Sequence, residues 1–327
     1  MHATTTINWG IIGCGDVTEI KSGPAFNKVP NSSLVAVMRR NAEKAADYAK
    51  RHQVSRWYND ASLLINDPGV NAIYIATPPS SHEQYALAAI EAGKPVYVEK
   101  PMALNYTAAK NIAEAAVAKN VKLVVAHYRR EWPLFKKLKA LVGTNAIGDI
   151  RLVRLALYKT AFIKEQLTNE SLSWRVDPAI SGGGIFHDLA PHQFDILYHL
   201  LGPAKKITGM AMNQCGNYVA DDIVAGNILF ENGIVFSGAW CFNAHEQSDR
   251  CEIIGSKGKL SFSFFDGGGI ELLANNTSTI FDFDTLQHVQ QPMIGKTVQY
   301  FLGNSTNPCP GEDGAEVMRW IDQFTAR

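Results

Sequence analysis

The chain has 327 residues, which at roughly 150 residues per domain predicts two domains. Its 31 lysine and arginine residues balance its 31 aspartate and glutamate residues, so charge does not favour nucleic acid or an acidic membrane surface as a partner. No apolar run reaches the roughly 18 residues of a membrane span, and the first residues show no secretory signal, so we expect a cytoplasmic protein. The five cysteines are scattered, which argues against a disulfide framework or a zinc site.

Residues 7 to 126 alternate short apolar runs with helical stretches, a pattern typical of βαβ units and a parallel sheet. The predicted strands are Ile7–Ile12, Leu34–Met38, Ala72–Ala76, Pro95–Val98 and Val121–Ala126. The predicted helices are Ala42–His52, Ser81–Glu91 and Asn105–Asn120. We therefore expect an α/β domain of the Rossmann type over residues 1–127.

After residue 128 the pattern changes to longer strand-like runs with few helices between them, which indicates a mostly antiparallel sheet. The predicted strands are Ile150–Lys159, Ile207–Asn213, Ile223–Phe230, Ile234–Cys241, Cys251–Ile254 and Lys259–Phe264, with helices near Ile185–Leu201 and Glu312–Phe324. Asn232-Gly233 predicts a hairpin with a type I′ turn, in which both central residues take positive φ. We expect a second, α+β domain over residues 128–327, with a ligand cleft between the domains.

The first predicted strand runs directly into the turn Gly13-Cys14-Gly15-Asp16-Val17-Thr18. Gly13 permits a tight turn, and Gly15 lets the backbone approach a pyrophosphate, which the N–H groups of the helix starting at Asp16 and Val17 then hold. Thr18 replaces the third glycine of the usual pattern, and a purely structural turn is the alternative. The position at the first strand-to-helix junction favours a dinucleotide-binding site.

The residues at the end of the second strand decide which dinucleotide fits. An Asp or Glu there accepts hydrogen bonds from the ribose of NAD, but this chain has Arg39 and Arg40. A guanidinium group makes a bidentate contact with a 2′-phosphate, so we expect NADP(H) in preference to NAD(H). The alternative is that both arginines are solvated residues at the start of a helix.

Further motifs fall into one pattern with the glycine turn, and together they resemble the family of glucose–fructose oxidoreductase, inositol dehydrogenase and the rhizopine-catabolism proteins. The resemblance extends over essentially the whole chain. The motifs are Thr77-Pro78 followed by His82, Glu99-Lys100-Pro101, Tyr128-Arg129-Arg130, Trp174-Arg175, and Gly182-Gly183-Gly184 leading to Asp188 and His192.

This resemblance implies a Rossmann domain, a C-terminal domain with an open, mostly antiparallel sheet, and an active site between the two. It also implies hydride transfer between a nicotinamide and a carbinol or carbonyl carbon of a sugar, a polyol or a similar small molecule. Many members form homodimers or homotetramers through the sheet. The cofactor-site residues that it implies are Gly13, Gly15, Arg39, Thr77, Pro78, His82, Glu99 and Lys100.

Hydride transfer to a carbonyl develops negative charge on oxygen, so the site needs a proton donor or a fixed positive charge. Lys100 follows a parallel strand at its carboxyl end, where such sheets place their ligands. Asp188 and His192 are four residues apart on a predicted helix, so the carboxylate can orient the imidazole. We expect these three residues to be catalytic, with either Lys100 or His192 as the proton donor.

Four further residues are expected to contact the substrate together with Asp188 and His192: Tyr128, Arg129, Trp174 and Arg175. A metal site at His187, Asp188 and His192 is not expected, because the two histidines do not share a helix face. Two other functions remain open. One is a nicotinamide-dependent glycosidase with tightly bound cofactor, and the other is a non-catalytic dinucleotide sensor.

Overall fold

The computed structural model describes residues 5–163 and 166–326, and the chain divides into two compact units. The first unit contains Met1–Arg129 and Leu286–Met318, and the second contains Arg130–Thr285 and Arg319–Arg327. The expected second domain, residues 128–327, is therefore not continuous. Residues 286–318 return to the first unit because they bury apolar side chains there, as where the Phe301 ring lies 5.6 Å from the Trp9 ring.

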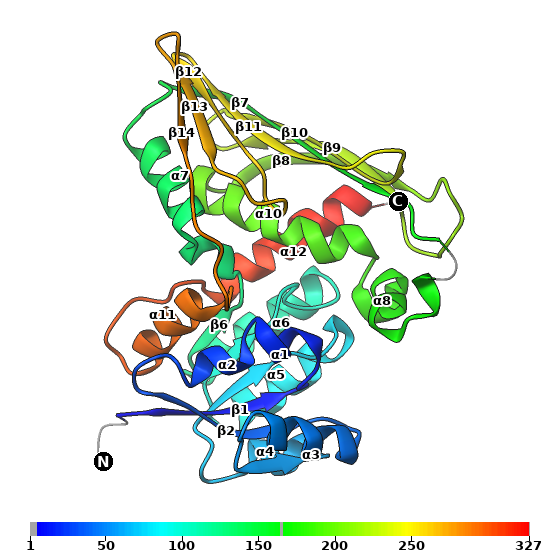
Figure 1. Ribbon diagram of the computed structural model, residues 1–327, viewed down its shortest axis with the longest axis vertical. Helices are drawn as coiled ribbons and strands as arrows, with labels where there is room; N and C mark the ends of the chain where they lie inside the picture. The colour runs from blue at the N-terminus through cyan, green and yellow to red at the C-terminus, as the bar shows by residue number, and fades with distance from the viewer. Residues whose placement is uncertain (1–4, 164–165, 327) are drawn as a thin grey trace. The chain divides into compact units, whose positions relative to one another are not determined.

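The first unit is built on a six-stranded parallel sheet with strand order β3-β2-β1-β4-β5-β6 (Figure 1). The order reverses between β1 and β4, which is the point where sheets of this kind bind ligands at their carboxyl edge. β4 is buried along its whole length, which explains its unbroken apolar run. The strands are β1 (Ile7–Ile12), β2 (Ser32–Met38), β3 (Arg56–Tyr58), β4 (Ala72–Ile75), β5 (Val96–Val98) and β6 (Leu123–Val125).

Short helices connect these strands, and a side chain caps the N-terminus of two of the longer helices. The Asn41 side chain accepts from the backbone N–H of Lys44 at 2.9 Å, and Asn105 accepts from Ala108 at 2.9 Å. The helices of this unit are α1 (Asp16–Ile20), α2 (Gly23–Phe26), α3 (Ala42–Arg51), α4 (Ala61–Ile65), α5 (His82–Glu91), α6 (Tyr106–Ala118), α11 (Gln291–Phe301) and the first part of α12 (Gly311–Thr325).

The second unit is built on an eight-stranded sheet with strand order β14-β13-β12-β11-β7-β10-β9-β8. Its strand pairs are antiparallel except for β7 with β10, which confirms the mostly antiparallel prediction. The strands are β7 (Ile150–Thr160), β8 (Ala204–Met212), β9 (Ile223–Phe230), β10 (Val235–Ala244), β11 (Ser248–Gly255), β12 (Gly258–Phe262), β13 (Ile270–Ala274) and β14 (Thr277–Phe281). Its helices are α7 (Pro133–Gly143), α8 (Glu170–Ser173), α9 (Pro178–Ser181), α10 (Ile185–Leu201) and the end of α12.

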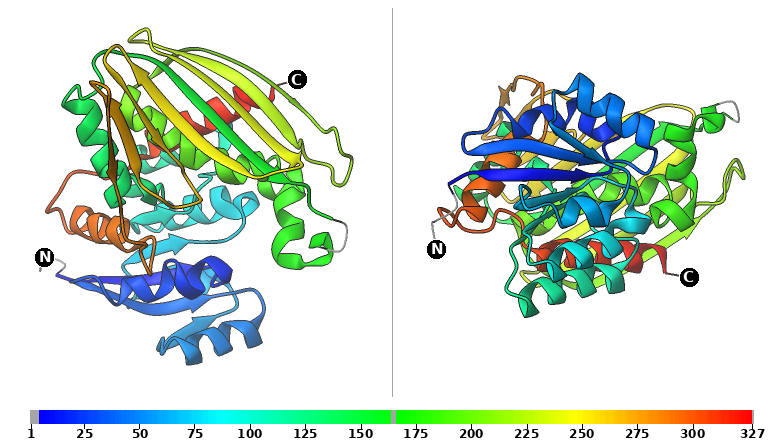
Figure 2. Two further views of the ribbon diagram at one scale, coloured as in Figure 1. Left: turned by 45° about the horizontal axis from the view of Figure 1, so that its top comes forward. Right: turned by 90° about the horizontal axis from the view of Figure 1, so that it is seen from below.

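An aromatic core holds α10 and the end of α12 on one face of this sheet (Figure 2). The Trp240 ring of β10 lies 5.0 Å from Phe186 and 5.5 Å from Phe194 of α10, and 5.6 Å from Phe324 of α12. All four side chains are fully buried. Because α10 also carries Asp188 and His192, this packing fixes both residues relative to the sheet.

The hairpin predicted at Asn232-Gly233 joins β9 to β10, but the type I′ turn was wrong. Gly233 has φ of 83°, whereas Asn232 is not among the described residues with positive φ. The Gly233 N–H donates to the Phe230 carbonyl at 3.0 Å, as in a longer turn that ends in one left-handed glycine. Asn275 and Asn276 both take positive φ, 51° and 60°, in the β13–β14 hairpin, which the sequence patterns did not predict.

None of the helices in the described part of the chain has the length and apolar content that crossing a membrane requires. Within the same residues, no group of three or more His, Cys, Asp or Glu side chains is arranged to hold a metal ion.

Candidate functional site

The turn after β1 requires glycine at residue 13. Gly13 has φ of 94°, and its N–H donates to the Met38 carbonyl of β2 at 2.9 Å. A Cβ atom at this position would lie 2.8 Å from the backbone nitrogen of Thr77. The turn is therefore pressed against the segment that follows β4, and only glycine fits there.

Gly15 is in the opposite situation. A Cβ atom on Gly15 would meet nothing nearer than the Gly13 carbonyl oxygen, at 4.0 Å, so the protein leaves open space beside this residue. The following helix, α1, has only five residues, and exposed Asp16 and half-buried Val17 begin it. The open space lies at the reversal of strand order, so the residues present fit a dinucleotide whose pyrophosphate approaches the backbone of the turn.

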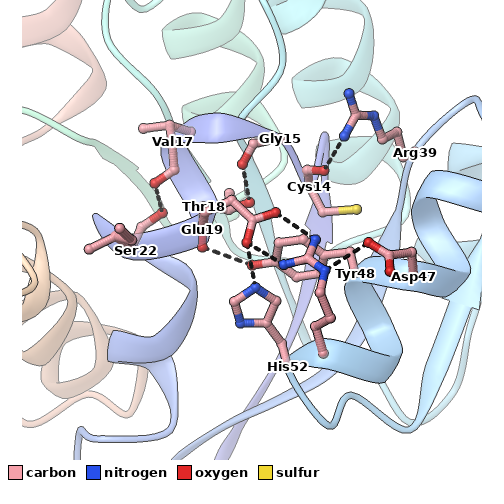
Figure 3. A network of polar contacts seen from close by, with 12 residues as sticks. Cys14, Gly15, Val17, Thr18, Glu19, Ser22, Arg39, Asp47, Tyr48 and His52 are labelled. Atoms are coloured by element: carbon pink, nitrogen blue, oxygen red, sulfur yellow. Dashed lines mark hydrogen bonds and ion pairs between the residues drawn. The ribbon is translucent and has the colours of Figure 1, made fainter.

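Arg39 lies beside the glycine turn, and its Nη1 donates to the Cys14 carbonyl at 3.3 Å (Figure 3). The side chain is half-buried, whereas Arg40 is exposed. Neighbouring contacts fix α1 against α3: Arg51 donates to both carboxylate oxygens of Glu19, at 2.7 and 2.8 Å. The Arg39 guanidinium at the end of β2 thus lies next to the turn, and no carboxylate stands at that strand end.

The resemblance implies His82 as a cofactor-site residue, and in the structure its ring lies against two backbone carbonyls. The residue is fully buried, with Nε2 2.7 Å from the Thr77 carbonyl and Nδ1 3.0 Å from the Pro101 carbonyl. Burial lowers the pKa of the imidazole. His82 thus joins the segments after β4 and β5 through backbone contacts, while Thr77 and Pro78 themselves are half-buried at the strand end.

Glu99 and Lys100 follow β5 at its carboxyl end. The Glu99 carboxylate is 5% exposed and accepts from the Tyr74 hydroxyl at 2.5 Å and from the Lys100 backbone N–H at 3.1 Å. It also accepts from the side-chain amide of Gln290, a residue that the sequence patterns did not single out. The Lys100 side chain is half-buried, and the Lys100–Pro101 bond is cis.

Tyr128 and Arg129 follow β6 in the first unit, and both are buried, at 7% and 6% exposure. The Arg129 guanidinium lies over the Tyr128 ring, 5.9 Å from its centre. The predicted substrate residues of the second unit also form a cluster. Arg175 Nε lies 3.4 Å from an Asp188 carboxylate oxygen, and the guanidinium group stacks on the Trp174 ring at 4.5 Å.

The glycines before α10 make room for a histidine ring. A Cβ atom on Gly183 would lie 2.0 Å from the His187 ring, so the ring occupies the space that a side chain would take. Gly184, at φ of 90°, precedes the helix as its cap residue. The lack of a side chain at Gly183 therefore lets the His187 ring pack against the backbone at the start of α10.

His192 is 4% exposed, and its ring lies edge-on to the Phe265 ring at 5.9 Å. Phe265 is half-buried in the segment after β12, and its backbone N–H donates to a carboxylate oxygen of Asp249. Burial raises the pKa of Asp249. The sequence patterns missed Phe265, and no local motif indicates it, because the contact depends on a carboxylate sixteen residues earlier.

A buried ion pair anchors α10 one turn after His192. The Arg130 guanidinium donates to the Asp195 carboxylate at 2.6 and 2.9 Å, and the two side chains are 3% and 1% exposed. Arg130 is part of the Tyr-Arg-Arg motif, whose first two residues were predicted to face the substrate. The third residue, Arg130, anchors α10 instead.

Comparisons with known proteins agree with this architecture. A family model described as an oxidoreductase family with an NAD-binding Rossmann fold matches residues 7–127, and the GFO/IDH/MocA C-terminal domain matches residues 135–261. Oxidoreductase P35 of Formosa agariphila is 48% identical over 318 residues, covering 97% of this chain and 98% of the relative. The chain belongs to the GFO/IDH/MocA oxidoreductase family. It is therefore an NAD(P)-dependent oxidoreductase.

Two further proteins are similar to this chain. The 1,5-anhydro-D-fructose reductase of Ensifer adhaerens is 26% identical over 254 residues, covering 77% of this chain and 74% of the relative. A levoglucosan dehydrogenase solved in complex with NADH and levoglucosan has the same fold, with a TM-score of 0.86, 22% identity, and coverage of 98% of this chain and 96% of that one. The expected fold class is confirmed, including the Rossmann sheet and the mixed second sheet.

Proposed function

We propose that this oxidoreductase passes a hydride between NADP(H) and the carbinol or carbonyl carbon of a sugar, a polyol or a similar small molecule. The observation that carries the proposal is the turn at Gly13 and Gly15, where open space beside Gly15 lies at the reversal of the strand order. The substrates named for the anhydrofructose reductase and the levoglucosan dehydrogenase support a sugar-like substrate.

The preference for NADP(H) rests on the end of β2. Arg39 lies against the Cys14 carbonyl, and Arg40 is exposed beside it, so both guanidinium groups are available to a 2′-phosphate. No carboxylate stands at this position to accept the ribose hydroxyls of NAD. NADP(H) therefore gains charge-assisted hydrogen bonds that NAD(H) lacks.

The chemistry is assigned to ionisable side chains of the chain. The nicotinamide, when bound, gives or accepts the hydride, and the chain supplies the proton and the positive charge. The Lys100 ammonium and the His192 imidazole are both able to donate a proton to the substrate oxygen or to take it back. Asp188, paired with Arg175, accepts a substrate hydroxyl.

Substrate contacts are assigned to aromatic and guanidinium groups. Trp174 offers the face of a half-buried indole to a sugar ring, and Arg175 offers donors to hydroxyl groups. Tyr128 and Arg129 are assigned the same role at the end of β6. The acidic, basic and aromatic side chains together suit a polyhydroxylated molecule better than an apolar one.

The outer face of the second sheet is proposed as the contact between copies of the chain. It carries a concave region of about 510 Å³ lined by residues of β7 to β11, and Met210 and Met212 of β8 are 62% and 45% exposed. Apolar exposure of this kind marks an interaction surface. Sedimentation equilibrium of the wild-type protein and of Met210→Lys tests it, since a monomer in both cases contradicts the proposal.

The decisive experiment is a parallel fluorescence titration of cofactor-stripped protein with NADPH and NADH, followed by a screen of sugars and polyols for absorbance change of the reduced nicotinamide. We expect NADPH to bind more tightly and at least one sugar-like compound to turn over. Tighter NADH binding overturns the NADP(H) assignment alone. Binding of neither cofactor overturns the proposed function.

A further inference from the structure

The segment after β14 places a fully buried glutamine at the end of β5. Gln290 precedes α11, belongs to the first unit, and lies outside both family-model matches, which end at residues 127 and 261. Its side chain is 0% exposed. A buried amide is retained only where its hydrogen bonds are made, so its partners indicate its role.

Both ends of the Gln290 amide have partners. The Nε2 atom donates to the Glu99 carboxylate, and the Oε1 atom accepts from the Tyr97 hydroxyl at 3.0 Å. The Tyr97 hydroxyl can only donate to the carbonyl end in this arrangement, so the amine end is turned toward Glu99. The amide orientation is thereby fixed by two residues, Tyr97 and Glu99.

The Glu99 carboxylate accepts from three neutral donors: the Gln290 amide, the Tyr74 hydroxyl and the Lys100 backbone N–H. Burial and then the Glu99 charge raise the pKa of both Tyr74 and Tyr97 well above the ordinary value, so both phenols keep their protons and donate. The carboxylate is thus held on both oxygens, and one of the bonds fixes the backbone of Lys100 directly.

The same short segment also contacts α1, which follows the glycine turn. The Gln290 backbone N–H donates to the Lys21 carbonyl at 3.2 Å, and His288 Nδ1 lies 2.6 Å from the Ile20 carbonyl. Lys28 Nζ lies 2.6 Å from the other ring nitrogen of His288. Residues 288–290 therefore connect the helix of the glycine turn to the carboxylate at the end of β5.

The strand order separates the two halves of a bound dinucleotide. β2 lies on one side of β1 and β5 on the other, so Arg39 serves the adenosine half and the end of β5 serves the nicotinamide half. We propose that Gln290 is a positioning residue that holds Glu99, and through it Lys100, in place for the nicotinamide half of the cofactor. The inference rests on the proposed function and adds to it a residue from outside the matched domains.

Two ligands separate this role from a general effect on folding. NADPH carries the nicotinamide, whereas 2′-phospho-ADP-ribose has the adenosine half, the diphosphate and the second ribose but lacks the nicotinamide ring. Gln290→Met keeps the size of the side chain and removes its hydrogen bonds. We expect it to weaken NADPH roughly five- to thirtyfold and 2′-phospho-ADP-ribose less than about twofold, measured by calorimetric titration.

Two more variants sharpen the test. Tyr97→Phe removes only the hydrogen bond that orients the amide. It should therefore cause a smaller loss of NADPH affinity, again with little effect on 2′-phospho-ADP-ribose. If Gln290→Met does not fold, Tyr97→Phe alone tests the positioning role. Thr297→Val is the matched control, because Thr297 of α11 is fully buried and bonds the Met293 carbonyl at 2.9 Å without contacting Glu99. It should leave both affinities unchanged.

Equal weakening of the two ligands by Gln290→Met, or the same selectivity in Thr297→Val, overturns the positioning role while the proposed function stands. Unchanged NADPH affinity in both Gln290→Met and Tyr97→Phe overturns it as well. If the wild-type protein binds neither ligand, the proposed function itself fails, and this inference fails with it.

Discussion

The two units hold their candidate site residues by different means. In the first unit the backbone positions most of the site residues. Gly13 is in close contact with Thr77, and Gly15 faces open space. Glu99 and Lys100 directly follow a buried strand. In the second unit, contacts between side chains from distant segments position the site residues. Arg175 pairs with Asp188, and Phe265 packs against His192.

The difference has a physical origin. A parallel strand fixes where its last residue lies. The position of a motif at a strand end in the fold can therefore be predicted from the sequence. A helix such as α10 is oriented only by what packs on it, here the aromatic core and the Arg130–Asp195 pair. A change at a strand end that faces open space, such as Gly15, should therefore act on ligand binding, whereas a change to the packing of α10 should act on stability as well.

The largest effect is expected from the proposed proton donors. Lys100→Met and His192→Ala should each lower turnover by roughly two to four orders of magnitude, because each removes a group that acts on the substrate oxygen. Affinity for 2′-phospho-ADP-ribose should be unchanged in both. Steady-state kinetics on the sugar found by the screen, with calorimetry, provides the measurement. Full activity in both variants contradicts the assigned roles.

The next effect tests the anchor of α10. Arg130→Met leaves the buried Asp195 carboxylate without its partner and should cost about 3–5 kcal/mol in the free energy of unfolding. The exposed pair of Arg151 with Asp149 is the control, and Arg151→Met should cost less than about 0.5 kcal/mol. Urea denaturation at pH 7 gives both values. Similar losses in the two variants would show that α10 does not depend on this pair.

The two glycines of the turn should separate stability from binding. Gly13→Ala places a side chain at φ of 94° against Thr77 and should destabilise the fold by about 1–3 kcal/mol. Gly15→Ala enters open space, so unfolding should be unchanged while NADPH affinity falls by about 1–3 kcal/mol. Thermal melts and titrations measure the two quantities. Normal NADPH binding by Gly15→Ala would remove the observation that carries the proposed function.

Arg39 tests which of the two cofactors the end of β2 favours. Arg39→Asp replaces the guanidinium with a carboxylate, which should weaken NADPH by about 1–3 kcal/mol relative to NADH. Arg40→Ala should change the ratio of the two affinities less, because that side chain is exposed. An unchanged ratio of the two affinities in Arg39→Asp shows that Arg39 does not contact the 2′-phosphate.

The sequence predicted the parts of the molecule that local rules govern. The glycine turn, five of the six strands of the first sheet (β3 is the exception) and the mostly antiparallel pairing of the second sheet follow from periodicity and turn residues. His82 and Gln290 show where these rules end. The His82 motif marked the right segment, but only the fold shows that both ring nitrogens face backbone carbonyls. Gln290 has no motif, because its role depends on contacts nearly two hundred residues away in the chain.

The smallest expected effect concerns acid stability, and it also separates the two units. In the second unit, burial lowers the pKa of His187 to about 4, and burial followed by the Arg130 charge lowers that of His199 to about 4. Unfolded histidine titrates near pH 6.5, so between about pH 6.5 and 4 the unfolded chain binds more protons. Stability from these residues is therefore lost as the pH falls through that window.

For Glu19, in the first unit, the window lies lower. The hydrogen bond from Arg51 lowers the pKa of Glu19 to about 2, so its contribution is present above about pH 4.5 and lost on acidification toward pH 2. The Glu19 side chain is one-third exposed, and solvent screening keeps this contribution below about 1 kcal/mol. His187 and His199 should therefore lose their contribution to stability at a higher pH than Glu19 does.

Urea denaturation at pH 7, 5 and 3 tests this order. His187→Gln removes a buried titrating group and should flatten the loss between pH 7 and 5 by about 1–2 kcal/mol, while Glu19→Gln should flatten only the loss between pH 5 and 3. His245→Gln, at an exposed position, should change neither. If His187→Gln and His245→Gln give the same pH dependence, His187 does not set the acid stability of the second unit. Its packing against Gly183 then serves only to position α10.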